Sequence, residues 1–576
     1  MIVVKWISFC LLPKMKREVI ILTFMFVIID SQKNEPTVQT SSGWIRGYYK
    51  KSYQGRLYEA YEGIPYAHPP VGKLRFQAPK KISPWTEELI ATKTRKECIQ
   101  YSHIPENKNE RVVGDEDCLY LNIYVPTQER NISSLPVIFW IHGGCFQYGA
   151  GSIFGAKYLI DYNVILITVN YRLGAFGFLS TENGIVSGNM GLKDQSLALQ
   201  WTYDNIGNFG GNNTKITLAG LSAGGASVHY HYLSPMSAGL FQNGISFSGT
   251  ALLCWVQTEK PLQKAKKLGA LMGCQTNNTE EMIECLRHCP SKSIAQATSH
   301  FMPWLYNPVT PFGPVVEKTE DNFFINKSPA DLIASGQIQD VPWITGVVSE
   351  EGLYPAADFV ADEFLLKNLD DNWEKIAPFL LDYNFTISPE NHSRVAKKIK
   401  QHYLGSEPID KKTVKSLIQL VGDRLFVIDA EKAARMQAKS NKSPVWFYYY
   451  RYRAAQSLSD TMSGTTRNFG VSHGDDAYLV IEQSYIDPTI KPSDREMQKD
   501  LINLWLSVTK NGIPDVGVDW PQVDQTNKAF NYLQISGPGQ FEIVNNSNLG
   551  EKIFWNSINF NENKIGIKSQ YVKEEL

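Results

Sequence analysis

Ser222 lies in the short run GLSAG, residues 220–224, whose residue types suit a serine nucleophile. The apolar residues 215–220 predict a buried strand, and residues 224–233 predict a helix just after the serine. A sharp strand-to-helix turn exposes the serine hydroxyl, and the flanking glycines remove side chains that would collide with neighbouring backbone. The sequence therefore predicts a nucleophile elbow, with helical N–H groups near Ser222 that favour negative charge.

A second glycine-rich stretch, residues 140–149 (WIHGGCFQYG), overlaps the end of an apolar run that predicts another buried strand. Consecutive glycines leave backbone N–H groups open, as in loops that hold an oxyanion. We expect the N–H groups of Gly144, Cys145 and Ala223 to face the oxygen of a tetrahedral intermediate. One such donor contributes on the order of 10² to 10³ in rate.

A serine hydroxyl needs a base, and His473 is the candidate. It lies far downstream in a glycine-bounded loop, GVSHGDD, where the order serine, acid, histidine places the base. Glu350 and Glu351 follow the apolar run 341–348, while Asp475 and Asp476 lie beside the histidine. The residues alone leave these four carboxylates open as the third member of a triad.

Apolar runs alternate with amphipathic segments, which predicts an α/β fold with a mostly parallel sheet. Residues 194–206 predict a helix, residues 355–430 a helical insertion, and residues 493–512 a helix with Ser493 or Asp494 as cap and Gly512 as stop. No linker divides the chain, so residues 34–562 are expected to form one domain, followed by a tail at 563–576. The net charge of −1 argues against nucleic acid as a partner.

The N-terminus has the pattern of a targeting segment. Basic residues precede the apolar run 19–29, which predicts a signal peptide at 1–31, with Met15 as an alternative start and an uncleaved anchor as the alternative fate. The C-terminal KEEL is similar to retrieval signals of the endoplasmic reticulum, or is simply an acidic tail. Both features favour the secretory pathway, with secretion or retention in the lumen.

Cysteines and sequons agree with that compartment. Seven of the eight cysteines lie beyond the signal, and Cys98 and Cys118, like Cys274 and Cys285, are close in sequence. Eight sequons offer glycosylation sites, at Asn131, Asn212, Asn277, Asn326, Asn384, Asn391, Asn441 and Asn545.

Several longer stretches resemble the type-B carboxylesterase and cholinesterase family, and the insect carboxylesterases most. They include GIPYAHPPVGKLRF, DEDCLYLNIYVP, VNYRLGAFGFLS, NMGLKDQSLALQW and IGNFGGN, in family order, and the resemblance covers residues 36–560. It implies an α/β-hydrolase fold and selects Glu351, which Gly352 follows, as the triad acid. It also implies that Cys98–Cys118 and Cys274–Cys285 are disulfides and that Arg75–Glu116 and Arg172–Asp194 are structural ion pairs.

Three departures from the family pattern bear on the substrate. The oxyanion loop has Cys145 where the family usually has glycine or alanine, which narrows the pocket and introduces a candidate reactive thiol. Leu221 precedes the serine where juvenile hormone esterases typically have glutamine. The loop from Cys98 to Cys118 contains no tryptophan, which disfavours choline esters.

The sequence thus predicts a serine carboxylic ester hydrolase with Ser222, Glu351 and His473 as its triad and no metal or cofactor. Small to medium carboxylic esters are the expected substrates, in detoxification or general ester turnover, and organophosphates or carbamates are expected inhibitors. The alternatives are a juvenile hormone esterase and a protein that captures such ligands without turnover or serves as a binding scaffold.

Overall fold

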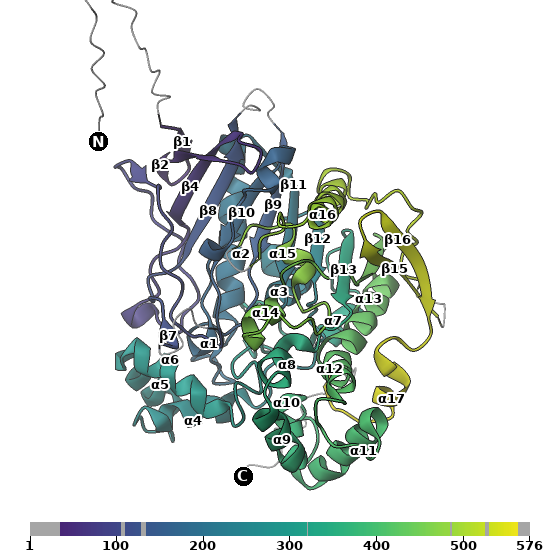
Figure 1. Cartoon of the computed structure of the whole chain (residues 1–576). Coiled ribbons are helices and arrows are strands. Elements are labelled where there is room, and N and C mark those ends of the chain that lie inside the picture. The colour runs from purple at the N-terminus through teal and green to yellow at the C-terminus, as the bar shows by residue number, and fades with distance from the viewer. Residues whose placement is uncertain are drawn as a thin grey trace, which may run out of the picture. The chain divides into compact units, whose positions relative to one another are not determined.

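An 11-stranded sheet forms the centre of the chain from Pro36 onward (Figure 1). The structure, a computed structural model, describes residues 35–104, 110–127, 134–319, 321–483, 486–524 and 529–562. The predicted signal peptide, Met15, the tail at 563–576 and Asn131 lie outside these residues. The strand order is β16-β15-β14-β13-β12-β11-β9-β10-β8-β4-β3. The bounds are β3 Tyr48–Lys51, β4 Leu57–Pro65, β8 Tyr120–Pro126, β9 Leu135–Ile141, β10 Ile165–Val169, β11 Gly211–Leu221, β12 Asn243–Phe247, β13 Trp343–Val348, β14 Val445–Tyr450, β15 Phe530–Gly537 and β16 Gln540–Asn546.

Neighbouring strands pair in parallel along the part of the sheet ordered β15-β14-β13-β12-β11-β9-β10. Antiparallel strands flank this block on both sides. Short strands complete the N-terminal part: β1 Thr37–Thr40, β2 Gly43–Arg46, β5 Leu89–Ile90, β6 Gln100–Tyr101 and β7 Val112–Val113. The mostly parallel α/β fold expected from the sequence is therefore correct. The sequence does not predict the antiparallel flanks, because their residues lack the continuous apolar runs that mark strands buried on both faces.

Strand β9 explains how the sheet is covered. All its residues are buried, and alternate side chains enter two separate apolar clusters. Val137 and Phe139 belong to the cluster that includes residues of α2 (Met190–Asn205) and α3 (Ala223–Leu233), while Ile138 and Trp140 belong to the cluster that includes α16 (Pro492–Asn511). Helices on both faces thus bury the parallel block, which fixes the ends of its strands.

The remaining helices lie mainly beyond one end of the sheet (Figure 1). The segment 355–430 is helical, as predicted. The helices are α1 Gly174–Phe178, α4 Pro261–Leu271, α5 Thr279–His288, α6 Ser291–Ala297, α7 Pro329–Ala334, α8 Leu353–Val360, α9 Glu363–Asp371, α10 Trp373–Leu380, α11 His392–Leu404, α12 Val414–Gly422, α13 Ile428–Ser440, α14 Leu458–Ser463, α15 Asp475–Tyr478 and α17 Lys552–Asn556. A π-helical turn, Asp423–Val427, joins α12 to α13.

Two helix boundaries differ from expectation. Helix α2 begins at Met190, before the predicted start at residue 194. Helix α16 begins at Pro492 after Lys491, so the expectation that Ser493 or Asp494 caps it is wrong: proline suits the first turn, where its missing N–H costs nothing. Gly512 ends α16 in a left-handed conformation, as expected. No helix among the described residues is both long and apolar enough to cross a membrane.

Candidate active site

Ser222 occupies the turn between β11 and α3. Its backbone has φ 60° and ψ −122°, a conformation that residues other than glycine rarely adopt. Close backbone packing explains the adjacent glycines: a Cβ on Gly224 would lie 2.0 Å from the carbonyl oxygen of Ile141, and one on Gly220 would lie 2.5 Å from the carbonyl carbon of Gly224. The N–H of Ser222 donates to the carbonyl oxygen of Phe247 at 2.8 Å, which anchors the turn to β12.

The loop after β9 packs directly on this turn. A Cβ on Gly143 would lie 3.0 Å from the Cβ of Ser222. Among the described residues, the backbone N–H groups of Gly144, Cys145 and Ala223 donate to no protein acceptor. Three open donors therefore belong to the two segments that meet at the predicted nucleophile, one of them at the N-terminus of α3.

His473 is paired with Glu351. Its Nδ1 lies 2.6 Å from Oε2 of Glu351, and both side chains are buried. Oε1 of the same carboxylate accepts the N–H of Val348 at 2.9 Å, which fixes the carboxylate at the end of β13. This arrangement orients the imidazole with Nδ1 toward the acid and leaves Nε2 for a second contact.

The other ring nitrogen faces no partner in the described part of the chain. Nε2 of His473 is buried and makes no hydrogen bond there, with Ser222 or with any other residue. The neighbouring residues do meet, since a Cβ on Gly474 would lie 3.1 Å from Cδ2 of Leu221. In ligand-free sites the contact between nucleophile and base is often long and tightens when substrate binds.

The three other candidate acids have different partners. Glu350 accepts the N–H of Val471 at 2.7 Å, Asp475 accepts the N–H of Ser472 at 2.8 Å, and Asp476 accepts the hydroxyl of Tyr448 at 2.6 Å. These bonds tie the histidine loop to the rest of the fold. Of the four carboxylates, Glu351 is the one placed against His473.

Cys145 is buried rather than reactive. Burial raises the pKa of its thiol to about 12, so it stays protonated, and the expectation of a reactive thiol in the pocket is wrong. Its Sγ lies 3.1 Å from the hydroxyl of Tyr354, and its backbone φ is 53°. The ring of Tyr354 also lies 5.4 Å from that of His473, and the ring of Phe426 lies 4.6 Å from it. The sequence alone does not identify these two aromatic residues, because neither belongs to a motif and their packing on His473 arises only in the folded chain.

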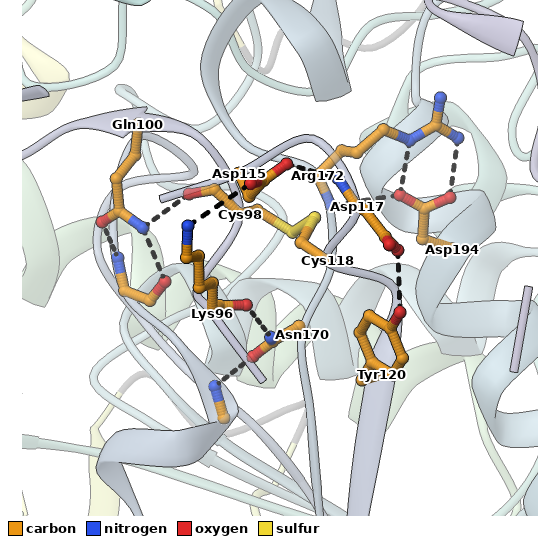
Figure 2. Close-up of a disulfide and its surroundings, with 12 residues drawn as sticks. Lys96, Cys98, Gln100, Asp115, Asp117, Cys118, Tyr120, Asn170, Arg172 and Asp194 are labelled. Carbon is orange, nitrogen blue, oxygen red and sulfur yellow. Dashed lines mark hydrogen bonds and ion pairs between the residues drawn. A yellow bond between two sulfur atoms is a disulfide. The ribbon is translucent and has the colours of Figure 1, made fainter. Parts of the chain in front are cut away.

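The Cys98–Cys118 disulfide closes a loop that contacts the glycine-rich segment after β9 (Figure 2). The amide of Gln100 binds Gly149 twice, accepting its N–H at 2.8 Å and donating to its carbonyl at 3.2 Å. Nearby, Arg172 forms a buried ion pair with Asp194 at 2.7 Å. The second expected ion pair, Arg75–Glu116, has its atoms 2.5 Å apart. Of these contacts, the two bonds of Gln100 reach the loop after β9, and they hold its end at Gly149.

The structure also contains the Cys274–Cys285 disulfide, and three further cysteines of the described chain are free: Cys145, Cys254 and Cys289. The sulfur of Cys289 lies within 4.8 Å of both disulfide sulfurs. Of the sequons, Asn277, Asn326 and Asn545 are exposed, while Asn212, Asn384, Asn391 and Asn441 are half-buried.

The sheet and the serine turn define an α/β hydrolase, and comparisons with known proteins give its family. The model of the carboxylesterase family matches residues 34–555. The chain belongs to this family, and it is a carboxylic ester hydrolase.

Among its relatives, venom carboxylesterase-6 of Apis mellifera is 54% identical over 554 residues, which are 96% of this chain and 99% of the relative. A carboxylic ester hydrolase of Bombus ignitus is 51% identical over 556 residues, with the same coverage. Among solved structures, the juvenile hormone esterase of Manduca sexta with OTFP covalently attached aligns with a TM-score of 0.79 at 28% identity, covering 91% of this chain and 99% of that one.

Proposed function

We propose that this carboxylesterase works through a Ser222–Glu351–His473 triad and an acyl-enzyme intermediate. The observation that carries the proposal is the buried 2.6 Å contact between Nδ1 of His473 and Glu351. The other ring nitrogen of His473, Nε2, makes no hydrogen bond in the described chain and lies next to the serine turn. The strained serine backbone and the three open N–H donors supply the other parts of an acyl-transfer site.

In the first step, Nε2 of His473 takes the hydroxyl proton of Ser222 as Oγ attacks the ester carbonyl. Glu351 stabilises the imidazolium that forms. The N–H groups of Gly144, Cys145 and Ala223 hold the negative oxygen, and His473 then gives its proton to the leaving alcohol. Water attacks the acyl-enzyme by the same route, with His473 again as base, and Ser222 is regenerated.

Turnover of a nitrophenyl ester tests the assignment. We expect Ser222→Ala and His473→Ala each to lower kcat by about 10⁴ or more, because members of a triad act as a unit. Ser227→Ala is a matched control, since Ser227 lies on α3 but donates to the carbonyl oxygen of Ala223 and is fully buried. Normal turnover by either triad variant would rule the assignment out.

Small to medium esters are the proposed substrates, in detoxification or general ester turnover, with organophosphates and carbamates as inhibitors. The juvenile hormone esterase of Manduca sexta has been solved with OTFP covalently attached. This complex supports covalent inhibition as a possibility for proteins of this fold. A panel from nitrophenyl acetate to long acyl esters, with a choline ester and juvenile hormone beside them, separates these roles. Comparable rates across the panel support a generalist. Dominant turnover of juvenile hormone favours the hormone esterase, and acylation without deacylation favours the sequestering protein.

We also propose that the protein enters the secretory pathway and carries N-linked glycans. The disulfides support an oxidising compartment, and the similarity to a carboxylesterase named for venom supports export. Asn277, Asn326 and Asn545 are the best glycan acceptors among the described sequons, because all three are exposed. A mass shift of the secreted protein upon deglycosylation, mapped to these asparagines, tests this.

A further inference from the structure

The helical segment formed by α12 and the turn after it contacts Gly352, next to the proposed acid, and His473, the proposed base. Gly422, the last residue of α12, packs against Gly352: a Cβ on Gly352 would lie 1.9 Å from the carbonyl oxygen of Ile418 and 2.6 Å from the N of Gly422. Four residues later, the ring of Phe426 lies 4.6 Å from the imidazole of His473. The stretch between these contacts is the π-helical turn Asp423–Val427.

A π-helical turn inserts an extra residue into an α-helix and changes which side chains face a given neighbour. If Asp423–Val427 relaxed to α-helical geometry, Phe426 would rotate away from His473. Such turns are uncommon and persist where surrounding contacts hold them. The carbonyl oxygen of Leu425 accepts the indole N–H of Trp255 at 2.9 Å, which fixes one side of the turn.

The other side is held by the end of the described chain. The guanidinium of Arg424 is buried, donates to Glu562 at 2.8 Å and lies 4.0 Å from the ring of Phe560. It also donates to the carbonyl oxygens of Leu381 and Asp382, so its position is fixed on several sides.

A second connection runs from the same turn to α17. The carboxylate of Asp423 accepts the hydroxyl of Tyr403 at 2.8 Å, and that hydroxyl accepts the indole N–H of Trp555 at 2.7 Å. The hydroxyl of Thr386 in turn donates to Glu562 and accepts its N–H. We call Trp555, Phe560 and Glu562 the C-terminal clasp.

We propose that Phe426 is a positioning residue for His473 and that the C-terminal clasp maintains the π-helical turn that presents it. The imidazole then contacts the rings of Phe426 and Tyr354 and has Glu351 at Nδ1, so it is restricted in rotation and keeps Nε2 available. The inference rests on the proposed role of His473 as base. It assigns to contacts of Glu562, at the end of the described chain, an effect on a residue about 90 positions earlier, by way of Arg424.

Steady-state kinetics of Phe426→Leu, Glu562→Gln and the double variant test the inference. Because His473 acts in both acylation and deacylation, we expect Phe426→Leu to lower kcat about tenfold while KM changes less than about twofold. Phe426→Tyr keeps the ring and should retain kcat within about threefold. Glu562→Gln should lower kcat about threefold, and the double variant should be no slower than Phe426→Leu alone, because both act on one contact.

Two further variants keep the result interpretable. Thr386→Val loosens the clasp without changing its charge and should reproduce the effect of Glu562→Gln even if the latter folds poorly. Glu88→Gln removes the charge of an ion pair with Arg46 remote from the triad and should leave kcat unchanged.

Unchanged kcat in Phe426→Leu, or losses that multiply in the double variant, would overturn the inference. Inactivity of Ser222→Ala in the same assays would then show that the proposed mechanism stands and that only the positioning role has failed. If Ser222→Ala is itself active, the mechanism has failed first.

Discussion

Nδ1 of His473 lies 2.6 Å from Oε2 of Glu351, although 122 residues separate them in the chain. Strand β13 delivers the carboxylate, and a loop anchored by Glu350 and Asp475 delivers the imidazole. The contact is fully buried, so its hydrogen bond is not weakened by competing water.

Removing the charge of Glu351 should disable the site while leaving the fold intact. We expect Glu351→Gln to lower kcat by about 10³- to 10⁴-fold, because the amide no longer stabilises the imidazolium or selects its tautomer. Glu350→Gln is the control, since Glu350 binds the N–H of Val471 and not His473. It should retain most activity at some loss of thermal stability. Equal losses of kcat in the two variants would contradict the choice of Glu351.

Cys145 should contribute its backbone rather than its thiol. Cys145→Gly removes the contact with Tyr354 but accepts the φ of 53° without strain, so we expect kcat/KM to stay within about threefold of the wild type. Cys145→Val places a β-branched side chain at the same positive φ and should misplace the N–H donor, at a cost of about 10- to 100-fold. Similar kinetics for the two variants would show that this N–H is not used.

The free thiols should react with a maleimide in an order set by burial. Cys289 is half-buried and should be labelled in the native protein, whereas Cys145 and Cys254 are buried and should react only after unfolding. Burial also raises the pKa of Cys254 well above its ordinary value, which further suppresses its thiolate. Peptide mass mapping reports the three sites separately; early labelling of Cys145 would place it on an open surface.

Much of this site can be predicted from the sequence, because several of its parts are specified by residues that are close together in the chain. The elbow around Ser222 and the loop with Gly144 are specified by small residues that permit close backbone contact, which is visible in sequence. The residues alone do not show that Glu351, and not Glu350, contacts His473. The two glutamates are adjacent, and only the folded backbone at the end of β13 decides which side chain points toward the histidine. The π-helical turn at Asp423 and the packing of Phe426 on His473 depend on partners as distant as Glu562. No local pattern encodes such contacts.

Asp475 should make stability depend on pH. Burial raises the pKa of its carboxyl from 3.8 to about 7. Between about pH 4 and pH 7 the folded protein therefore keeps a proton that the unfolded chain has lost, so this group stabilises the fold at low pH, and the contribution is lost as pH rises through 7. We expect Asp475→Asn, which cannot titrate there, to lose less in Tm than the wild type between about pH 5 and pH 8.

The difference in Tm between the wild type and Asp475→Asn, followed across pH, isolates the contribution of Asp475. Buried histidines such as His142, whose pKa burial lowers to about 4, act with the opposite sign below about pH 6.5, but they are common to both proteins. Asp117→Asn, at an exposed site, should follow the wild type across the range. Parallel Tm curves for the wild type and Asp475→Asn would contradict the raised pKa.

Covalent trapping with a fluorophosphonate tests the central claim most directly, because the reagent labels only a serine that a nearby base activates. We predict one adduct per chain, mapped by peptide mass spectrometry to Ser222, with labelling abolished in Ser222→Ala and slowed by orders of magnitude in His473→Ala. An adduct on another residue, or unchanged labelling of Ser222 in His473→Ala, would contradict the account.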